Sequence, residues 1–156
     1  MPEKRFVDLL EVLDRKRPVI IQTHDYPDHD AVASGFSLLR LLEEQGFSCS
    51  FCYGRDIHDF SVTSIIEDLG IPLKQASSLR FGGEEQIILV DGIAGNRNVT
   101  ILSEAPIVGI IDHHQPPPQN TSPQEESCSA AYTARQGKTA YVPAGSCSSR
   151  RLPAVK

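Results

Sequence analysis

The sequence predicts an α/β domain with a parallel sheet that carries helices on both faces. Two observations support this prediction. Short, continuous apolar runs alternate along residues 1–115 with longer segments of helical spacing, and runs that are apolar throughout are typical of strands buried on both faces, as in parallel sheets. Polar side chains also follow three of these runs, and ligands of open α/β sheets bind beyond the carboxyl ends of the strands.

The first part of the chain shows both patterns in turn. Apolar residues at helical spacing predict a helix over residues 6–16, an apolar run predicts a strand over 18–23, and a second helix is expected from 30 to about 45. Ser34 and Gly35 lie in the first turns of that second helix. Because they are small, they would let the helix lie close to the sheet.

The same patterns continue through the middle of the chain. We expect strands over residues 48–53, 86–91 and 107–111, a helix over 57–69, and a short extended piece at 71–73. Alternation of strands and helices in this order is typical of parallel sheets with helical crossovers.

The cysteines do not form a recognisable zinc site. Cys49 and Cys52 are spaced as C-x-x-C, but they lie inside a predicted strand, and Cys128 and Cys147 add no ligand pattern. Residues three apart on a strand face opposite sides of the sheet. We therefore interpret Cys49 and Cys52 as buried free thiols.

Composition excludes several classes of protein. The 156 residues carry a formal net charge of −5, which argues against binding nucleic acid through bulk positive charge. Apolar runs are too short to cross a bilayer, and the N-terminal residues lack a signal-peptide core. We expect a cytoplasmic protein with no membrane partner.

Side chains that could bind metal follow three of the predicted strands. They are His24, Asp25, Asp28 and Asp30 after the first strand, Asp91 at the end of a later strand, and Asp112, His113 and His114 after the last one. Because the carboxyl ends of parallel strands lie at one edge, we expect these clusters to converge. Taken singly, Asp28 or Asp30 could instead cap the following helix, and Asp112 could cap a turn. Such an explanation is weaker when three strand ends all present ligands.

The residue types indicate the metal and the chemistry. Carboxylates with imidazoles and no thiolate favour Mn²⁺, with Mg²⁺, Co²⁺ or Fe²⁺ as alternatives. There are more ligands than one ion needs, which suggests two ions that share a carboxylate about 3.5–4 Å apart. Such a pair activates water and clamps the oxygens of a phosphate, so the reaction class that follows is phosphoester hydrolysis.

The three motifs in order resemble those of the DHH phosphoesterase superfamily. His24-x-x-x-Asp28-x-Asp30 is similar to its first motif, the strand that ends in Asp91 to its second, and Asp112-His113-His114 to its third. That superfamily includes RecJ-type exonucleases, nanoRNases that also dephosphorylate pAp, cyclic-dinucleotide phosphodiesterases, and family II pyrophosphatases and exopolyphosphatases. The resemblance covers about residues 17–115 and implies a Rossmann-like domain.

The resemblance also implies a role for each residue. His24 and Asp28 would hold one Mn²⁺, Asp30 would help to hold the other, and Asp91 would bridge both. His114 would bind the second ion. His113 would contact the substrate phosphate, and Asp112 would orient a histidine. The catalytic residues implied are therefore Asp91, Asp112 and His113.

The C-terminal part departs from the family pattern. Residues 116–156 are rich in Pro and Ser, carry five Lys or Arg against two Glu, and have no acidic residue after Glu126. We expect this tail to be poorly ordered apart from a helical turn at 127–134, since it has little apolar surface to bury. The family's fourth-motif aspartate and its C-terminal substrate-binding domain have no counterpart here. We therefore expect an incomplete domain over residues 1–115 and a weak catalyst.

The most direct interpretation is a Mn²⁺-dependent phosphoesterase of the nanoRNase/pAp phosphatase type, acting on a small nucleotide or short oligonucleotide. One alternative is a polyphosphate or pyrophosphate hydrolase. Another is a module that binds metal or nucleotide without turnover. The sequence leaves the exact substrate and the oligomeric state open.

Overall fold

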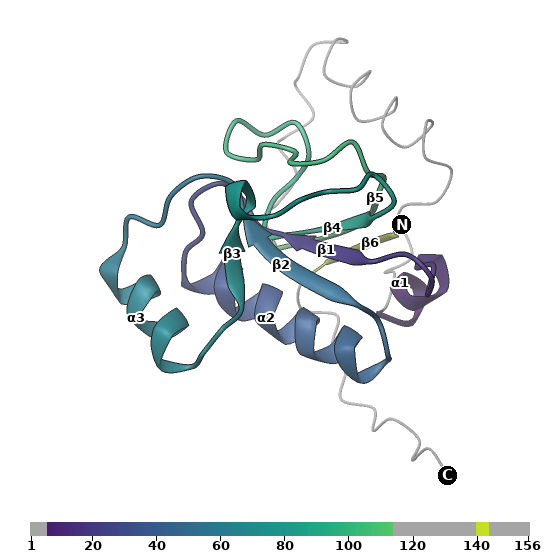
Figure 1. The fold of residues 1–156 in the computed structure, drawn as a ribbon, viewed down its shortest axis with the longest axis horizontal. Coiled ribbons are helices and arrows are strands. Elements are labelled where there is room, and N and C mark those ends of the chain that lie inside the picture. Colours follow the sequence, from purple (N-terminus) through teal and green to yellow (C-terminus); the bar gives the residue numbers. More distant parts are fainter. Residues whose placement is uncertain (1–5, 114–139, 144–156) are drawn as a thin grey trace.

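A computed structural model describes the backbone of residues 6–113 and 140–143, with side chains for 6–113. Its core is a six-stranded sheet in the order β3-β2-β1-β4-β5-β6 (Figure 1). Every pair of neighbouring strands runs parallel. The predicted α/β class with a parallel sheet is therefore confirmed.

The strands are β1 (Val19–Gln22), β2 (Cys49–Tyr53), β3 (Leu73–Gln75), β4 (Gln86–Val90), β5 (Ile107–Asp112) and β6 (Ala140–Pro143). The helices are α1 (Phe6–Val12), α2 (His29–Glu44) and α3 (Phe60–Asp68), with a 3₁₀ turn η1 (Ala76–Ser78) after β3. None of these helices has the length and apolar character that a membrane crossing requires.

Two helices are shorter than their periodicity predicts, because an aspartate side chain accepts a backbone hydrogen bond near one end of each. After α1 the Asp14 carboxylate accepts a hydrogen bond from the Lys16 N–H at 2.9 Å, which closes a turn where the helix was expected to continue. At α3 the Asp59 side chain accepts from the Ser61 N–H at 2.8 Å and sets the helix start at Phe60.

The edge strand β6 was not predicted. It pairs with β5 from Gly109↔Ala140 to Asp112↔Pro143, inside the segment that we expected to be poorly ordered. Its four residues contain a single large aliphatic side chain, Val142, so their pattern gives no strand signal, and only the pairing with β5 defines the strand. The helical turn expected at 127–134 lies outside the described residues.

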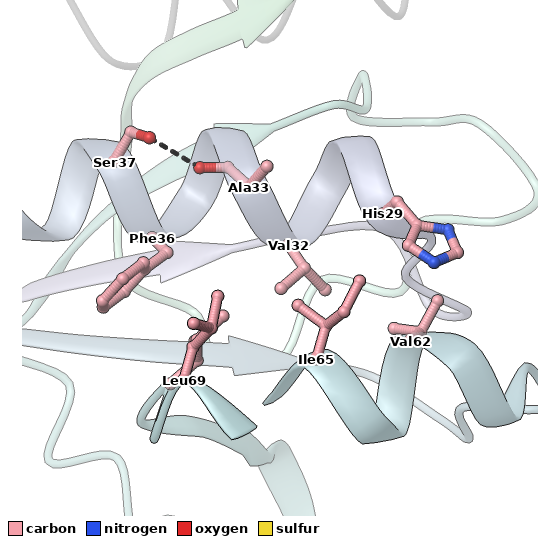
Figure 2. A pocket seen from close by; sticks show the side chains of 9 residues that line it. His29, Val32, Ala33, Phe36, Ser37, Val62, Ile65 and Leu69 are labelled. Carbon is pink, nitrogen blue, oxygen red and sulfur yellow. Dashed lines mark hydrogen bonds between the residues drawn. The ribbon is translucent and has the colours of Figure 1, made fainter. Parts of the chain in front are cut away.

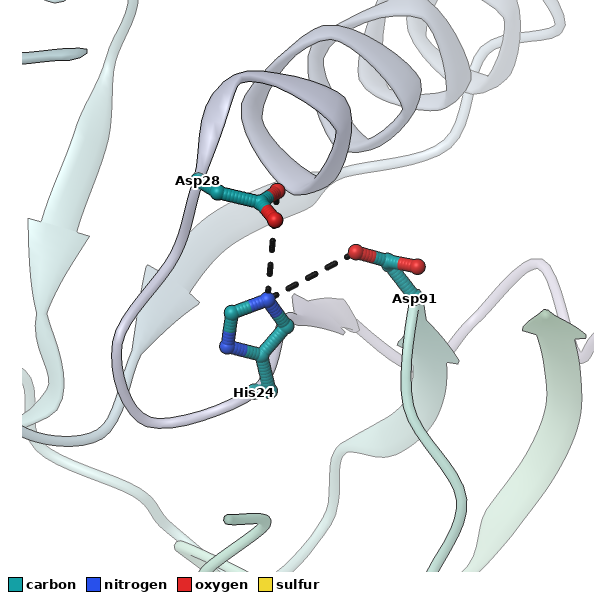
Figure 3. Close-up of side chains that lie close together, drawn as sticks. All are labelled: His24, Asp28 and Asp91. Atoms are coloured by element: carbon teal, nitrogen blue, oxygen red, sulfur yellow. Dashed lines mark ion pairs between the residues drawn. The ribbon is translucent and has the colours of Figure 1, made fainter. Parts of the chain in front are cut away.

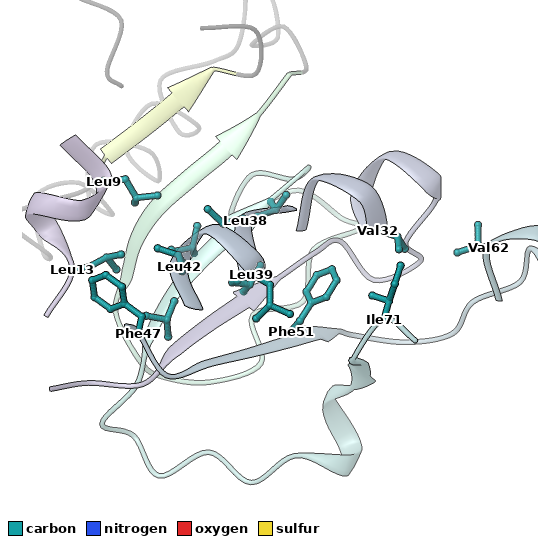
Figure 4. Close-up of a cluster of buried hydrophobic side chains, with 14 residues drawn as sticks. Leu9, Leu13, Val32, Leu38, Leu39, Leu42, Phe47, Phe51, Val62 and Ile71 are labelled. Atoms are coloured by element: carbon teal, nitrogen blue, oxygen red, sulfur yellow. The ribbon is translucent and has the colours of Figure 1, made fainter. Parts of the chain in front are cut away.

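The sheet separates two apolar clusters. On one face α1 and α2 cover β1, β2 and β4, and this larger cluster is shown in Figure 4. On the other face the cluster around Ile20, Ile87 and Leu89 is covered by side chains from residues 79–81 and 94–105. Helices on both faces were predicted, but within the described part of the chain loops cover the second face.

The cysteine interpretation agrees with this arrangement. Cys49 packs with the larger cluster and Cys52 with the smaller one, so their side chains face opposite sides of the sheet. Both are free thiols, but only Cys52 is buried as predicted, whereas Cys49 is half-buried. Burial raises the pKa of Cys49 to about 11 and that of Cys52 to about 12, so both stay protonated near neutral pH.

Gly35 lies where α2 packs directly against β2. A Cβ atom at this position would overlap the ring of Phe51, which is buried in β2. The small side chain expected from the sequence is therefore required by the packing of helix on strand, and it leaves the start of α2 seated over the ends of β1 and β2.

Gly35→Ala should lower the free energy of unfolding by about 1–3 kcal/mol, because the added methyl overpacks the Phe51 contact. This loss is partly offset by the gain of about 1 kcal/mol in helix propensity that alanine has over glycine in a helix interior. Urea unfolding measures the difference, with Ser37→Ala on the exposed side of α2 as the matched control. A Gly35→Ala variant more stable than the parent would contradict the packing argument.

Candidate metal centre

Three adjacent strands, β1, β4 and β5, end at the same edge of the sheet (Figure 1). The register pairs Gln22 with Leu89. His24 lies two residues after Gln22 and Asp91 lies two residues after Leu89, so the two follow at the same level of the sheet. Asp91 also donates its N–H to the Ile111 carbonyl at 2.8 Å, which fixes it beside the end of β5. The strand ends thereby bring together residues far apart in the sequence.

The first group of possible ligands is His24, Asp28 and Asp91. The His24 Nε2 atom lies 3.5 Å from Asp91 Oδ2 and 4.0 Å from Asp28 Oδ1 (Figure 3). These residues come from the end of β1, the start of α2 and the end of β4. One ligand atom from each lies within 4.8 Å of the others, a separation that a single ion could span.

The second group is Asp30, Asp91 and His113, and its ligand atoms also lie within 4.8 Å of one another. The His113 Nδ1 atom is 3.1 Å from Asp91 Oδ1 and 3.4 Å from Asp30 Oδ2. Asp91 therefore belongs to both groups. Its Oδ2 atom approaches the first group and its Oδ1 atom the second.

Asp91 has an unusual backbone. It has a φ of 55°, a left-handed conformation that residues other than glycine seldom adopt. Aspartate tolerates this conformation better than most side chains. Its side chain is 5% exposed. Strained backbone at a cluster of ionisable side chains is a feature of functional sites.

Asp28 serves as the N-cap of α2. Its Oδ1 atom accepts hydrogen bonds from the N–H groups of Asp30 and Ala31 at 3.1 and 3.0 Å. The capping role considered from the sequence is therefore real. A carboxylate has lone pairs for further partners, so capping is compatible with metal binding and holds the side chain in place beside His24.

Asp25 lies in the same loop but belongs to neither group. It is buried, and its carboxylate accepts from the N–H and the hydroxyl of Thr100 at 3.0 and 2.7 Å. Arg55 Nε lies 3.4 Å from its Oδ2 atom. Backbone bonds join Asp25 to Asn98 and Arg55 at 2.7 and 2.9 Å. Asp25 thus ties together the loops that follow β1, β2 and β4.

The histidines of the last motif are only partly described. His113 lies in the second group, although the resemblance implied that it contacts substrate and that His114 binds the ion. His114 lies outside the described residues. Asp112 is buried at the end of β5.

The start of α3 is fixed to the start of α2 beside the candidate centre. The Ser61 hydroxyl donates to Asp59 Oδ1 at 2.7 Å and lies 2.9 Å from His29 Nε2. Since the hydroxyl has one hydrogen, His29 Nε2–H is the donor in the second bond. Hydrogen bonds from Ser61 hold the pKa of Asp59 below its ordinary value.

An apolar cavity of about 300 Å³ lies between α2 and α3. Figure 2 shows Val32 and Phe36 of α2 facing Ile65 and Leu69 of the other wall, with His29 at one end. Its lining is almost wholly hydrocarbon, so it offers no set of groups for phosphate chemistry. The candidate functional site is therefore the polar sheet edge.

The fold and the paired groups define an α/β domain with a candidate centre for two divalent ions. The donor set fits such ions, because it consists of carboxylates and imidazoles without a thiolate. Residues 18–142 match the family model described as DHH family, N-terminal domain. This match covers more than half of the chain, which therefore belongs to the DHH family.

The chain is also similar to the uncharacterized protein MJ1633 of Methanocaldococcus jannaschii. The two are 32% identical over 101 residues, which cover 65% of this chain and 21% of that protein. The chain thus spans about a fifth of the length of this curated relative. Proteins of the DHH family are typically phosphoesterases that depend on divalent metal ions.

Asp91→Asn should weaken Mn²⁺ binding at both groups, whereas Asp30→Asn should weaken it at one, by at least about 10-fold in each case. The amide removes the negative charge and keeps the size of the side chain, and asparagine also tolerates a positive φ. Calorimetric titration of each variant with Mn²⁺ gives the number of sites. If both variants lost a single site, Asp91 would not be shared.

Asp25→Ala should lower the free energy of unfolding by about 2–3 kcal/mol, because the buried carboxylate would no longer accept the two hydrogen bonds from Thr100 or pair with Arg55. Thr100→Val removes only the hydroxyl bond and should cost less, about 1 kcal/mol. Denaturant unfolding compares the two. A stability equal to that of the parent for Asp25→Ala would show that Asp25 does not hold these loops.

Proposed function

We propose that this chain carries the metal centre of a phosphoesterase that hydrolyses phosphodiester or phosphomonoester bonds of short nucleotides, with Mn²⁺ as the ion. The observation that carries the proposal is the position of Asp91 between two groups of ligands. One carboxylate shared in this way would hold two ions close enough to act on one phosphate. Membership of the DHH family supports the same reaction class.

His24, Asp28 and Asp91 would hold the first ion, and Asp30, Asp91 and His113 the second. When bound, such ions polarise the phosphoryl oxygens and lower the pKa of water. His113 is the better candidate for the second ion than His114, because its Nδ1 atom already lies 3.1 Å from Asp91. His114, the next residue, would then be the candidate for contact with the substrate phosphate.

Exposure of the ligands is consistent with access by a substrate. Asp91 and His24 are 5% and 12% exposed, whereas Asp28 and Asp30 are 64% and 65% exposed. The buried pair would fix the ions from the sheet side, and the open side would face solvent. Asp112, which is buried at the end of β5, is proposed to orient a histidine.

Charge makes the proposed activity depend on metal. Three carboxylates converge at the two groups, and they would repel a phosphate in the absence of cations. Binding of divalent ions reverses the local charge. The same electrostatic change would serve a nucleotide, pyrophosphate or polyphosphate, so the substrate has to be distinguished by experiment.

The purified chain should release phosphate from pAp or cleave a dinucleotide when Mn²⁺ is present. A chelator should stop the reaction, and Asp91→Asn should slow it at least about 100-fold. Pyrophosphate and polyphosphate assayed beside these substrates test the alternative hydrolase. Hydrolysis that survives both the chelator and Asp91→Asn would overturn the proposal. Bound Mn²⁺ without turnover of any of the four substrates would indicate a binding module.

A further inference from the structure

The ring of Tyr26, in the loop that carries His24 and Asp28, is stacked on the ring of His58, with centroids 5.4 Å apart and planes inclined by 23°. We propose that this aromatic pair binds the nucleobase of a nucleotide whose phosphate lies at the metal centre. The inference rests on the proposed function and specifies which part of the substrate is held outside the metal ligands.

The two rings come from loops that leave the same edge of the sheet. Tyr26 follows β1, His58 follows β2, and these strands are parallel neighbours. Tyr26 is two residues from His24 and two from Asp28. Since consecutive Cα atoms are about 3.8 Å apart, the Tyr26 Cα lies within about 8 Å of those of both candidate ligands. A ribose and its phosphate bridge a gap of this order.

The pair is accessible. Tyr26 is 43% exposed although it is a large aromatic residue, and His58 is also exposed. Stacked rings leave their outer faces for a further planar group, and every base has a π-face that can stack on them. The pair therefore offers surface of the kind on which nucleic-acid bases stack.

The segments that carry the rings are held in place. The Arg55 N–H donates to the Asp25 carbonyl at 2.9 Å, which joins the loop after β2 to the loop of Tyr26. On the other side of His58, Asp59 caps α3, and Ser61 is bonded to His29 at 2.9 Å. A surface fixed before binding loses less entropy when a ligand arrives.

The acidic residues near His58 favour an uncharged planar ligand, because the nearby Arg55 is already paired with Asp25. Asp56 and Asp59 lie on either side of His58 in the sequence, and both are exposed. A second phosphate at this position would meet these carboxylates, whereas a neutral base would not be repelled. The nucleobase of a nucleotide therefore fits the pair better than the next phosphate of a polyphosphate chain.

The test uses two ligands that share a phosphomonoester and differ in the base, namely AMP and ribose 5-phosphate. Each is titrated calorimetrically into the full chain loaded with Mn²⁺. AMP should bind more tightly than ribose 5-phosphate. Tyr26→Ala should weaken the binding of AMP by about 5-fold to 150-fold, the range that stacking on an aromatic side chain contributes. The affinity for ribose 5-phosphate should not change.

Three further variants test whether the aromatic pair itself accounts for the preference for AMP. Tyr26→Phe keeps the ring and should retain most of the preference for AMP, while His58→Ala should lose part of it. Phe60→Ala removes a ring that is 83% exposed but lies outside the pair, and AMP binding should not change. The thermal midpoint of each variant checks that it is folded.

Two results would overturn the inference. One is equal affinity of the parent chain for AMP and ribose 5-phosphate, and the other is a loss of AMP binding in Phe60→Ala as large as that in Tyr26→Ala. Mn²⁺ binding and hydrolysis, measured on the same samples, test the proposed function separately. Bound metal with no preference for AMP would contradict the base site alone, whereas absence of bound metal would contradict the metal centre.

Discussion

The arrangement of the candidate centre depends on the carboxylate of Asp91. It lies at the end of β4, between the ends of β1 and β5, and its two oxygens approach different groups of ligands. The left-handed backbone at this residue and its bond to the Ile111 carbonyl place the side chain at the junction. A shift of this one residue would alter both groups together.

The parallel sheet explains why residues so distant in sequence meet there. In the register, Gln22 pairs with Leu89 and Val90 with Ile111. Continuing each strand by one or two residues places His24, Asp91 and the residues after β5 next to one another. Strand direction and register therefore place most of the candidate ligands, and the start of α2 adds the carboxylates of Asp28 and Asp30.

Continuous apolar runs revealed β1, β4 and β5 in the sequence, because their interior positions are buried or half-buried and their polar residues, Gln22, Gln86 and Asp112, stand at strand ends. The edge strand β6 gave no such signal, since its four residues depend on pairing with β5. The contact between the buried Asp25 and Thr100 joins residues 75 apart in sequence, and no local pattern predicts it. Which of His113 and His114 is the candidate ligand of the second ion depends on the direction of each side chain at the end of the strand. The sequence Asp112-His113-His114 alone does not define that direction.

The loop from His24 to Asp30 combines structural and chemical tasks by turning successive side chains in different directions. His24 approaches Asp91, Asp25 is buried against Thr100, and Tyr26 stacks on His58 in partial contact with solvent. Asp28 then caps α2 and lies beside His24. Asp25 fixes the backbone between His24 and Asp28 and so helps to hold these two candidate ligands in position. Such preorganisation reduces the entropy that binding must overcome, so a buried aspartate outside the ligand set contributes to the geometry of the candidate centre.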